Sequence, residues 1–223
     1  MEGITFLDEG LHEIDLPNGA SINVYASPYT PEFYDWGFPY ERNEDRYNES
    51  ATSLSDAKNI ASNPIPSFTG TGRPIDILIT HGPPWQILDQ TNRGDFAGCP
   101  HLLQALMRAR PLLHCFGHIH EGWGVTTINW ADNVDSVATT PASMSEWKDG
   151  AWRSGVTSGG PQDVSVDLEE AKKRHAATLD LSRTGTGLQI GRQTTVVNAA
   201  IMNVGYQPAN APWLLDIDLP RAS

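Results

Sequence analysis

Two apolar runs, each ending in histidine and glycine, constrain the fold of this chain more than any other feature. Residues 75–84 read IDILITHGPP, and residues 112–124 read LLHCFGHIHEGWG. A short apolar run that stops at Gly or Pro predicts a buried strand. Because ligands bind at the carboxyl ends of strands in an open α/β sheet, we expect His81, His118 and His120 to meet along one edge.

The surrounding pattern predicts an α/β fold. Residues 102–110 have helical spacing and stop before a proline, and residues 124–130 alternate like a strand. This strand–helix–strand alternation is typical of an α/β core. Further strands are predicted at residues 3–6, 11–14, 21–26, 195–203 and 212–218.

Two polar segments are interpreted as insertions in a single domain spanning residues 1–223. Residues 41–73 are rich in Asn, Ser, Asp and Glu, so we expect a flexible segment with a little helix near 53–61. Residues 147–192 form the second insertion. Within it, residues 164–178 place acidic before basic side chains, an order that suits the dipole of a helix.

Composition narrows the class of partner. The formal net charge is −12, and no cluster of Lys and Arg offers the phosphate contacts that a nucleic acid needs. No apolar stretch approaches the roughly 20 residues of a membrane span, and the N-terminus lacks a signal core. We therefore expect a cytoplasmic protein that binds neither nucleic acid nor a membrane. Cys99 and Cys115 are too few for a disulfide framework and are predicted to be buried free thiols.

The histidines are candidate metal ligands only in combination. A lone histidine that ends a strand is usually a hydrogen-bonded polar cap, and His114, which alternates within its strand, is interpreted as structural. His81 together with His118 and His120, each after a buried strand with an adjacent glycine, favours metal ligation. His118 and His120 can point to two places, which suits two neighbouring metals, although three histidines around one Zn²⁺ is also a sound arrangement. Gly82 and Gly117 are expected to let the backbone turn sharply beside the ligands.

The sequence HGPP at residues 81–84, followed by GHIHEGWG at residues 117–124, resembles the calcineurin-like metallophosphoesterase superfamily. More narrowly, it is similar to the metallophosphoesterase-domain-containing branch. YASP at residues 25–28, DWGF at 35–38 and the strand pattern ending at 216–220 also fit that branch. The resemblance excludes the two insertions.

The resemblance implies an αββα sandwich with a dinuclear metal site that hydrolyses a phosphomonoester or phosphodiester, in which case the substrate is a small-molecule, nucleotide-like phosphate ester. By the resemblance, His81 and His118 would bind the second of two divalent metal ions, and His120 the first. Histidine and carboxylate ligands suit Mn, Zn or Fe.

Candidate substrate contacts lie in the loops that would cover the metals. They are Arg93 in the loop after residue 84, Glu121 beside the His-x-His turn, and Trp36 in the aromatic segment 27–40. Specificity in such folds resides in loops of this kind.

The chain departs from the family pattern upstream of His81. The Asp-x-His, Gly-Asp and Gly-Asn-His-Glu segments that supply the remaining ligands do not occur there, and Gly94-Asp95 lies downstream, in the wrong order. Without a bridging carboxylate, two dications a few ångströms apart repel strongly. We therefore expect a partial sandwich lacking its first strands and helix. It should bind fewer metal ions, weakly, and hydrolyse little, and we assign no catalytic residue.

Three hypotheses follow. The first is the C-terminal portion of a hydrolase, whose missing segment comes from a longer transcript or an overlooked exon. The second is a non-catalytic binding or regulatory descendant that uses the two insertions as partner surfaces. The third is a mononuclear three-histidine site. The first is favoured, and the sequence leaves the metal, the substrate and the oligomeric state open.

Overall fold

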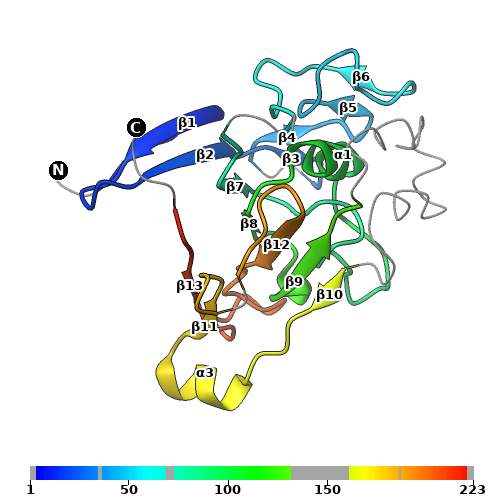
Figure 1. Cartoon of the computed structure of the whole chain (residues 1–223). Coiled ribbons are helices and arrows are strands. Elements are labelled where there is room, and N and C mark those ends of the chain that lie inside the picture. The colour runs from blue at the N-terminus through cyan, green and yellow to red at the C-terminus, as the bar shows by residue number, and fades with distance from the viewer. Residues whose placement is uncertain (1–3, 35–36, 69–72, 132–160, 186, 220–223) are drawn as a thin grey trace.

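One large mixed sheet forms the centre of the molecule (Figure 1). The computed structural model describes residues 4–34, 37–68, 73–131, 161–185 and 187–219. The sheet has seven strands in the order β1-β2-β7-β8-β12-β9-β10. These strands are β1 (Gly10–Asp15), β2 (Ser21–Ser27), β7 (Ile77–Thr80), β8 (Leu113–Phe116), β12 (Gln193–Asn198), β9 (Gly124–Asn129) and β10 (Gln162–Asp163).

Four neighbouring strands of this sheet run parallel, so their carboxyl ends meet at one edge. β2 pairs with β7, β7 with β8, and β8 with β12, each in parallel. β1 is antiparallel to β2, and β9 is antiparallel to β12. The short apolar runs of β7 and β8 suit central parallel strands because such strands are buried on both faces.

Side chains pack on both faces of the central strands, although Ile79 of β7 is 41% exposed. On one face, helix α1 (Pro100–Ala109) buries Leu103 completely in the larger core, which also contains Leu78 of β7. On the other face, a smaller cluster that includes Val197 packs against Trp213 and Leu215. Those two side chains belong to β13 (Trp213–Asp216), which pairs in parallel with β11 (Ala177–Asp180).

Local chemistry explains the bounds of α1. The thiol of Cys99 accepts a hydrogen bond from the backbone N–H of Leu102, and Pro100 occupies the first turn, where its missing N–H costs nothing. Arg110 ends the helix in the left-handed conformation, and Pro111 cannot continue it. The helix predicted from the apolar spacing is therefore confirmed. Cys99 is buried and Cys115 half-buried, and both are free thiols.

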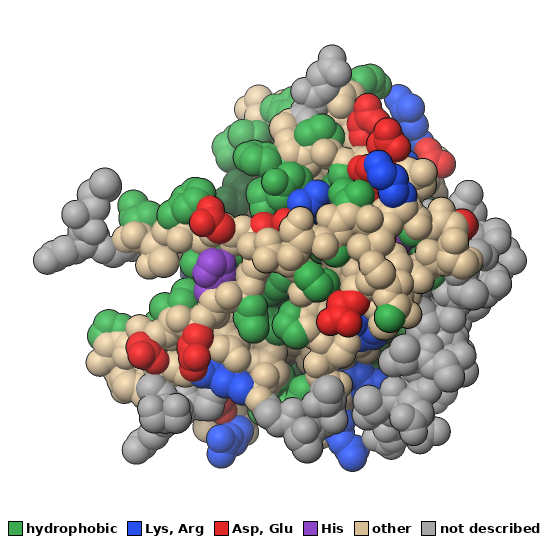
Figure 2. Space-filling view, turned by 90° about the horizontal axis from the view of Figure 1, so that it is seen from above, with side chains coloured by type: hydrophobic (Ala, Val, Ile, Leu, Met, Phe, Trp, Pro, Cys, Tyr) green, Lys and Arg blue, Asp and Glu red, His purple; other side chains and the backbone are tan. Residues whose placement is uncertain are grey.

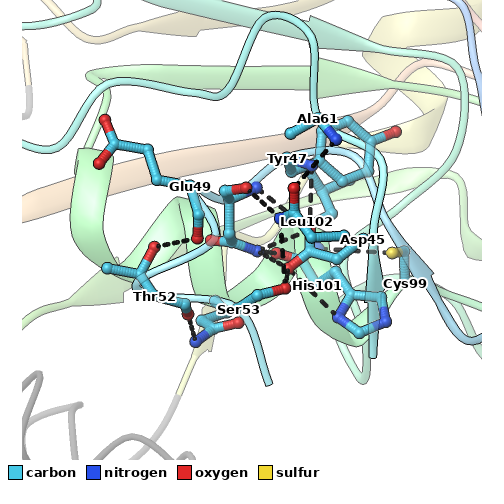
Figure 3. A network of polar contacts seen from close by, with 12 residues as sticks. Asp45, Tyr47, Glu49, Thr52, Ser53, Ala61, Cys99, His101 and Leu102 are labelled. Atoms are coloured by element: carbon cyan, nitrogen blue, oxygen red, sulfur yellow. Dashed lines mark hydrogen bonds and ion pairs between the residues drawn. The ribbon is translucent and has the colours of Figure 1, made fainter. Parts of the chain in front are cut away.

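The polar segment after residue 41 packs against α1 through a buried network (Figure 3). The fully buried carboxylate of Asp45 accepts hydrogen bonds from the backbone N–H groups of Tyr47 and Asn48, at 3.0 and 3.1 Å. The side-chain amide of Asn48 donates to the carbonyl oxygen of His101 at 2.9 Å and accepts from the Arg108 guanidinium at 2.6 Å. These bonds connect the segment to two turns of the helix.

The helix expected near residues 53–61 is wrong. The segment forms turns and two-residue strands, because its Asp, Asn and Ser side chains bond to nearby backbone groups in competition with a helix. Tyr47, Leu54 and Ile65 are at most 3% exposed, so the described part of this segment belongs to the core rather than to a loose loop. The short strands of this segment are β5 (Glu44–Asp45) and β6 (Lys58–Asn59), and a similar pair, β3 (Thr30–Pro31) and β4 (Pro39–Tyr40), precedes it.

The second polar segment contains the predicted helix. Helix α3 (Leu168–Arg174) begins after Asp167, whose side chain accepts from the N–H groups of Glu169 and Glu170. Residues 132–160 lie outside the described part of the chain, and residues 4–6 form no strand. The fold class expected from the sequence is confirmed: the molecule is mixed α/β with one large mixed sheet and few helices, consistent with a partial metallophosphoesterase sandwich.

The surface seen in Figure 2 shows exposed hydrophobic side chains interspersed with separate acidic and basic groups. On that face, the positive charges are scattered rather than gathered in one stripe. Among the described helices, none has both the length and the apolar content that a membrane span requires.

Candidate metal centre

The strand ends bring two of the predicted ligands into contact. His81 directly follows β7, and His118 lies two residues beyond β8. Nε2 of His81 and Nδ1 of His118 are 3.0 Å apart, and their ring centroids are 4.7 Å apart. Two nitrogens bound to one tetrahedral ion lie about 3.3 Å apart when each is about 2.0 Å from it. The His81–His118 pair therefore has nearly the spacing that a shared metal ion requires.

The backbone around the pair is tight at one glycine and not at the other. A Cβ added to Gly82 would lie 3.0 Å from Oγ1 of Thr30 and 3.7 Å from the His118 ring, so glycine allows this close approach. The same atom on Gly117 would meet nothing closer than 3.9 Å. The sharp turn expected at Gly117 is instead made by His118, whose φ is 66°. Such a conformation is uncommon in a non-glycine residue and is concentrated at functional sites.

The electrostatic environment keeps the pair neutral. Burial lowers the pKa of His118 to about 4, and the neighbouring His81, His120 and Arg42 act in the same direction. Burial also lowers the pKa of His81. Neutral imidazole is the form that donates a lone pair to a metal, so no proton has to leave either ring at neutral pH.

His120 is held separately from this pair. It begins the 3₁₀ helix η1 (His120–Gly122), and its Nδ1 lies 3.0 Å from the carbonyl oxygen of Asn203. A carbonyl can only accept, so Nδ1 carries the proton and Nε2 keeps its lone pair. Metal-bound histidines usually donate their second ring nitrogen in this way.

The described residues gather no larger ligand set. Within them, no three His, Cys, Asp or Glu side chains lie close enough to hold one ion. The mononuclear three-histidine hypothesis therefore finds no support in the structure, and no described carboxylate joins the His81–His118 pair. That these histidines bind metal stays a prediction.

Asn198, at the end of β12, connects the loops of the site and was missed by the sequence reasoning. Its buried side chain donates to the carbonyl oxygens of Leu88 at 3.1 Å and Ile119 at 2.8 Å, and it accepts from the N–H of Ala200 at 3.0 Å. The only signal in the sequence was an amide side chain closing an apolar strand. Asn198 fixes the turn that carries His118 and His120.

Two pockets are lined in part by His118. One, of about 210 Å³, is lined by residues that include His118, His120, Arg42 and Tyr206. The other, of about 310 Å³, is lined by His81 and His118 together with apolar side chains. The ring of Phe33 lines both pockets and meets the His118 ring edge-to-face at 6.4 Å.

Of the three candidate substrate contacts, the structure places one at the 210 Å³ pocket, one away from it, and does not describe the third. Glu121 lines the 210 Å³ pocket and accepts from the backbone N–H of Asn92 at 3.2 Å. Arg93 is exposed in its loop and does not line this pocket, whereas Arg42 does. Sequence reasoning missed Arg42 because it lies at the start of a segment interpreted as an insertion. Trp36 lies outside the described residues.

Comparison with known proteins adds evidence on the family. No family model matches the chain. The chain is 29% identical to metallophosphoesterase domain-containing protein 1 of Homo sapiens and of Mus musculus over 204 residues, which are 91% of this chain and 38% of those proteins. It thus spans about two-fifths of their length.

Over shorter stretches, the chain is also similar to two proteins that carry other names. A UPF0046 protein of Caenorhabditis elegans is 36% identical over 107 residues, covering 48% of this chain and 22% of that protein. "Probable rhamnogalacturonate lyase C" of Emericella nidulans is 35% identical over 131 residues, covering 58% of this chain and 10% of that protein. The similarity that extends over nine-tenths of the chain supports the resemblance indicated by the two histidine motifs: the chain is similar to metallophosphoesterase-domain proteins.

Proposed function

We propose that this chain carries the histidine side of a divalent-metal site that hydrolyses a small phosphate ester. The observation that carries the proposal is the 3.0 Å contact between His81 and His118 at the carboxyl ends of two neighbouring parallel strands. The similarity to metallophosphoesterase domain-containing proteins supports the use of a divalent metal. A bound metal ion would supply Lewis-acid polarisation of a phosphoryl oxygen.

The residues present fit one part of such a site. The pair offers two neutral nitrogens from adjacent strands, and the Nδ1–H of His120 is already engaged by Asn203, which leaves its Nε2 available. Asn198 holds the intervening turn in place without contributing a ligand. What this chain does in the proposed reaction is to hold and orient the metal. None of its described groups is assigned as a general acid or base.

A non-catalytic descendant is the second candidate. The observation that favours it is the lack of any described carboxylate beside the pair, since a carboxylate bridge stabilises two closely spaced dications. A protein of this kind would bind metal, or a phosphate ester through it, without turnover.

Metal titration tests the proposal. We expect isothermal titration with Zn²⁺ to detect a site whose affinity falls about 100-fold or more in His81→Ala and in His118→Ala. His12→Ala is the matched control. His12 lies on the edge strand β1, and among the described residues its ring bonds to the Asp8 carbonyl oxygen alone. Unchanged Zn²⁺ affinity in both pair variants would refute the proposal.

Hydrolysis separates the two candidates. Under the first, the Zn²⁺- or Mn²⁺-loaded chain should release nitrophenol from bis(p-nitrophenyl) phosphate, and His81→Ala should abolish that release. Metal binding that depends on the pair, without any hydrolysis, would favour the second candidate.

A further inference from the structure

We propose that the 210 Å³ pocket beside His118 binds the alcohol side of the phosphate ester and selects a flat, apolar, ring-shaped group. This inference rests on the proposed function and names the substrate class of the same site. The pocket is called the Tyr206 pocket below. The residues that carry the argument are Phe33, Arg42, His118, His120, Val204 and Tyr206.

The walls of the Tyr206 pocket are aromatic and apolar. The Tyr206 ring meets the His120 ring edge-to-face at 5.7 Å and 86°, and Phe33 meets His118 at 6.4 Å and 88°. Val204 adds an aliphatic side. A dry cavity of about 150 Å³ with similar walls is large enough for benzene. A space of about 210 Å³ therefore accommodates one ring, and edge-to-face partners favour an aromatic one.

The turn that presents Tyr206 is rigidly built although its side chains are exposed. The side-chain oxygen of Asn203 accepts from the N–H groups of Gly205 at 2.8 Å and Gln207 at 3.1 Å, and the N–H of Tyr206 donates to the Asn203 carbonyl oxygen at 2.9 Å. Tyr206 itself has a φ of 56° and is 59% exposed. These bonds fix the backbone that carries Tyr206, and a large aromatic side chain left open to solvent on such a backbone, at a pocket wall, is suited to contact a ligand.

The same carbonyl oxygen of Asn203 accepts the Nδ1–H of His120. The carbonyl oxygen of Asn203 thus bonds both to the backbone of Tyr206, which forms the aromatic wall, and to His120, a candidate metal ligand. A ring seated against Tyr206 would consequently have its phosphate directed to the His81–His118 side of the site.

Charge sets the direction of the ester within the pocket. Arg42 lines the pocket, and within the described residues no acidic side chain forms an ion pair with it. Glu121 also lines this pocket and would repel an anionic oxygen placed beside it. The phosphoryl oxygens are therefore directed towards Arg42 and His118, and the uncharged ring towards Tyr206.

Direct binding of two phosphonates tests the inference without requiring turnover. Zn²⁺-loaded protein is titrated with phenylphosphonate and with methylphosphonate by calorimetry. We expect phenylphosphonate to bind about tenfold more tightly, because only its ring fills the pocket. In Tyr206→Ala this ratio should fall to about threefold or less. In Tyr206→Phe, which keeps the ring, the ratio should stay near its original value.

Two further variants separate the parts of the pocket. Arg42→Gln should weaken both phosphonates by about tenfold and leave their ratio unchanged, because it removes a contact to the charged end only. Leu214→Ala, an exposed apolar position on β13, is the control and should change neither affinity. Thermal melts confirm that each variant is folded.

Equal affinity for the two phosphonates in the unaltered protein would overturn the inference while leaving the proposed function intact. A ratio that survives Tyr206→Ala would overturn it as well. If neither phosphonate binds, the pocket assignment is wrong. The Zn²⁺ titration of the His81 and His118 variants then shows whether the proposed function fails with it.

Discussion

Acid should destabilise this fold through one buried histidine. His114 lies in β8 with no exposed surface, and its Nε2 is 2.8 Å from Oγ1 of Thr80. That hydroxyl donates to the carbonyl oxygen of Gly82 at 2.8 Å, so it accepts from His114, whose proton is therefore on Nε2. Nδ1 is buried and has no hydrogen-bond partner among the described residues. A second proton would have no acceptor there, and burial lowers the pKa of His114 to about 3.

The sign and size of the effect follow from linkage. The pKa of His114 in the folded state is depressed below the unfolded value of about 6.5. Below pH 6.5, the unfolded state therefore binds a proton that the folded state does not bind. The stabilisation is present above pH 6.5 and is lost as the pH falls towards the folded-state pKa. Between pH 7.5 and pH 5, this one group should remove about 2 kcal/mol from the free energy of unfolding.

The assay is urea unfolding followed by tryptophan fluorescence at several pH values between 5 and 7.5. Stability depends on pH through other groups too, so the informative quantity is the difference from His114→Gln. This variant can still donate to Thr80 but cannot be protonated. The stability of the original chain relative to the variant should fall by about 2 kcal/mol over this range, a shift of about 1 M in midpoint. A difference that stays constant with pH would refute the assigned burial of a neutral ring.

Three other substitutions test the packing that positions the site. Asp45→Ala should cost about 3–5 kcal/mol by urea unfolding, because the buried N–H groups of Tyr47 and Asn48 lose their acceptor and the Arg108 charge loses a nearby carboxylate. A cost below about 1 kcal/mol would contradict the network. Gly122→Ala should lower stability by about 1–3 kcal/mol in thermal melts, since its Cβ would lie 2.0 Å from the Leu88 carbonyl oxygen, and an unchanged melting temperature would contradict that approach. Asn198→Ala should cost about 2 kcal/mol and also weaken Zn²⁺ affinity, so unaltered affinity would show that Asn198 does not position the ligands.

The sequence predicted the parts of the fold whose signals are local and apolar. β7, β8 and α1 were recognised because continuous or helically spaced apolar residues can be buried in few other ways. Their order then required the strands to lie side by side, which brought His81 to His118. The sequence could therefore predict that two histidines meet at one edge, although it could not predict that His118 makes its own turn in the left-handed conformation.

The polar parts of the site were not predictable in the same way. Arg42 and Tyr206 lie in loops without periodicity, 164 positions apart in the sequence, and nothing local indicates that they share a pocket. Their positions depend on side-chain to backbone hydrogen bonds, such as those of Asn203, which are decided by tertiary structure. A pattern of hydrophobicity carries no information on such bonds.

The buried network around Asp45 connects these two kinds of structure. Arg42 precedes β5 by two residues. β5 is connected to α1 through Asn48, which donates hydrogen bonds both to Asp45 and to the His101 carbonyl oxygen. A buried carboxylate is costly unless every one of its partners is in place, so this segment has few alternative arrangements once the helix is formed. Helix α1, which the sequence predicts, thus fixes the position of the segment after residue 41, which the sequence does not predict. It follows that the cation of the Tyr206 pocket is positioned by a core element that does not itself reach the ligand.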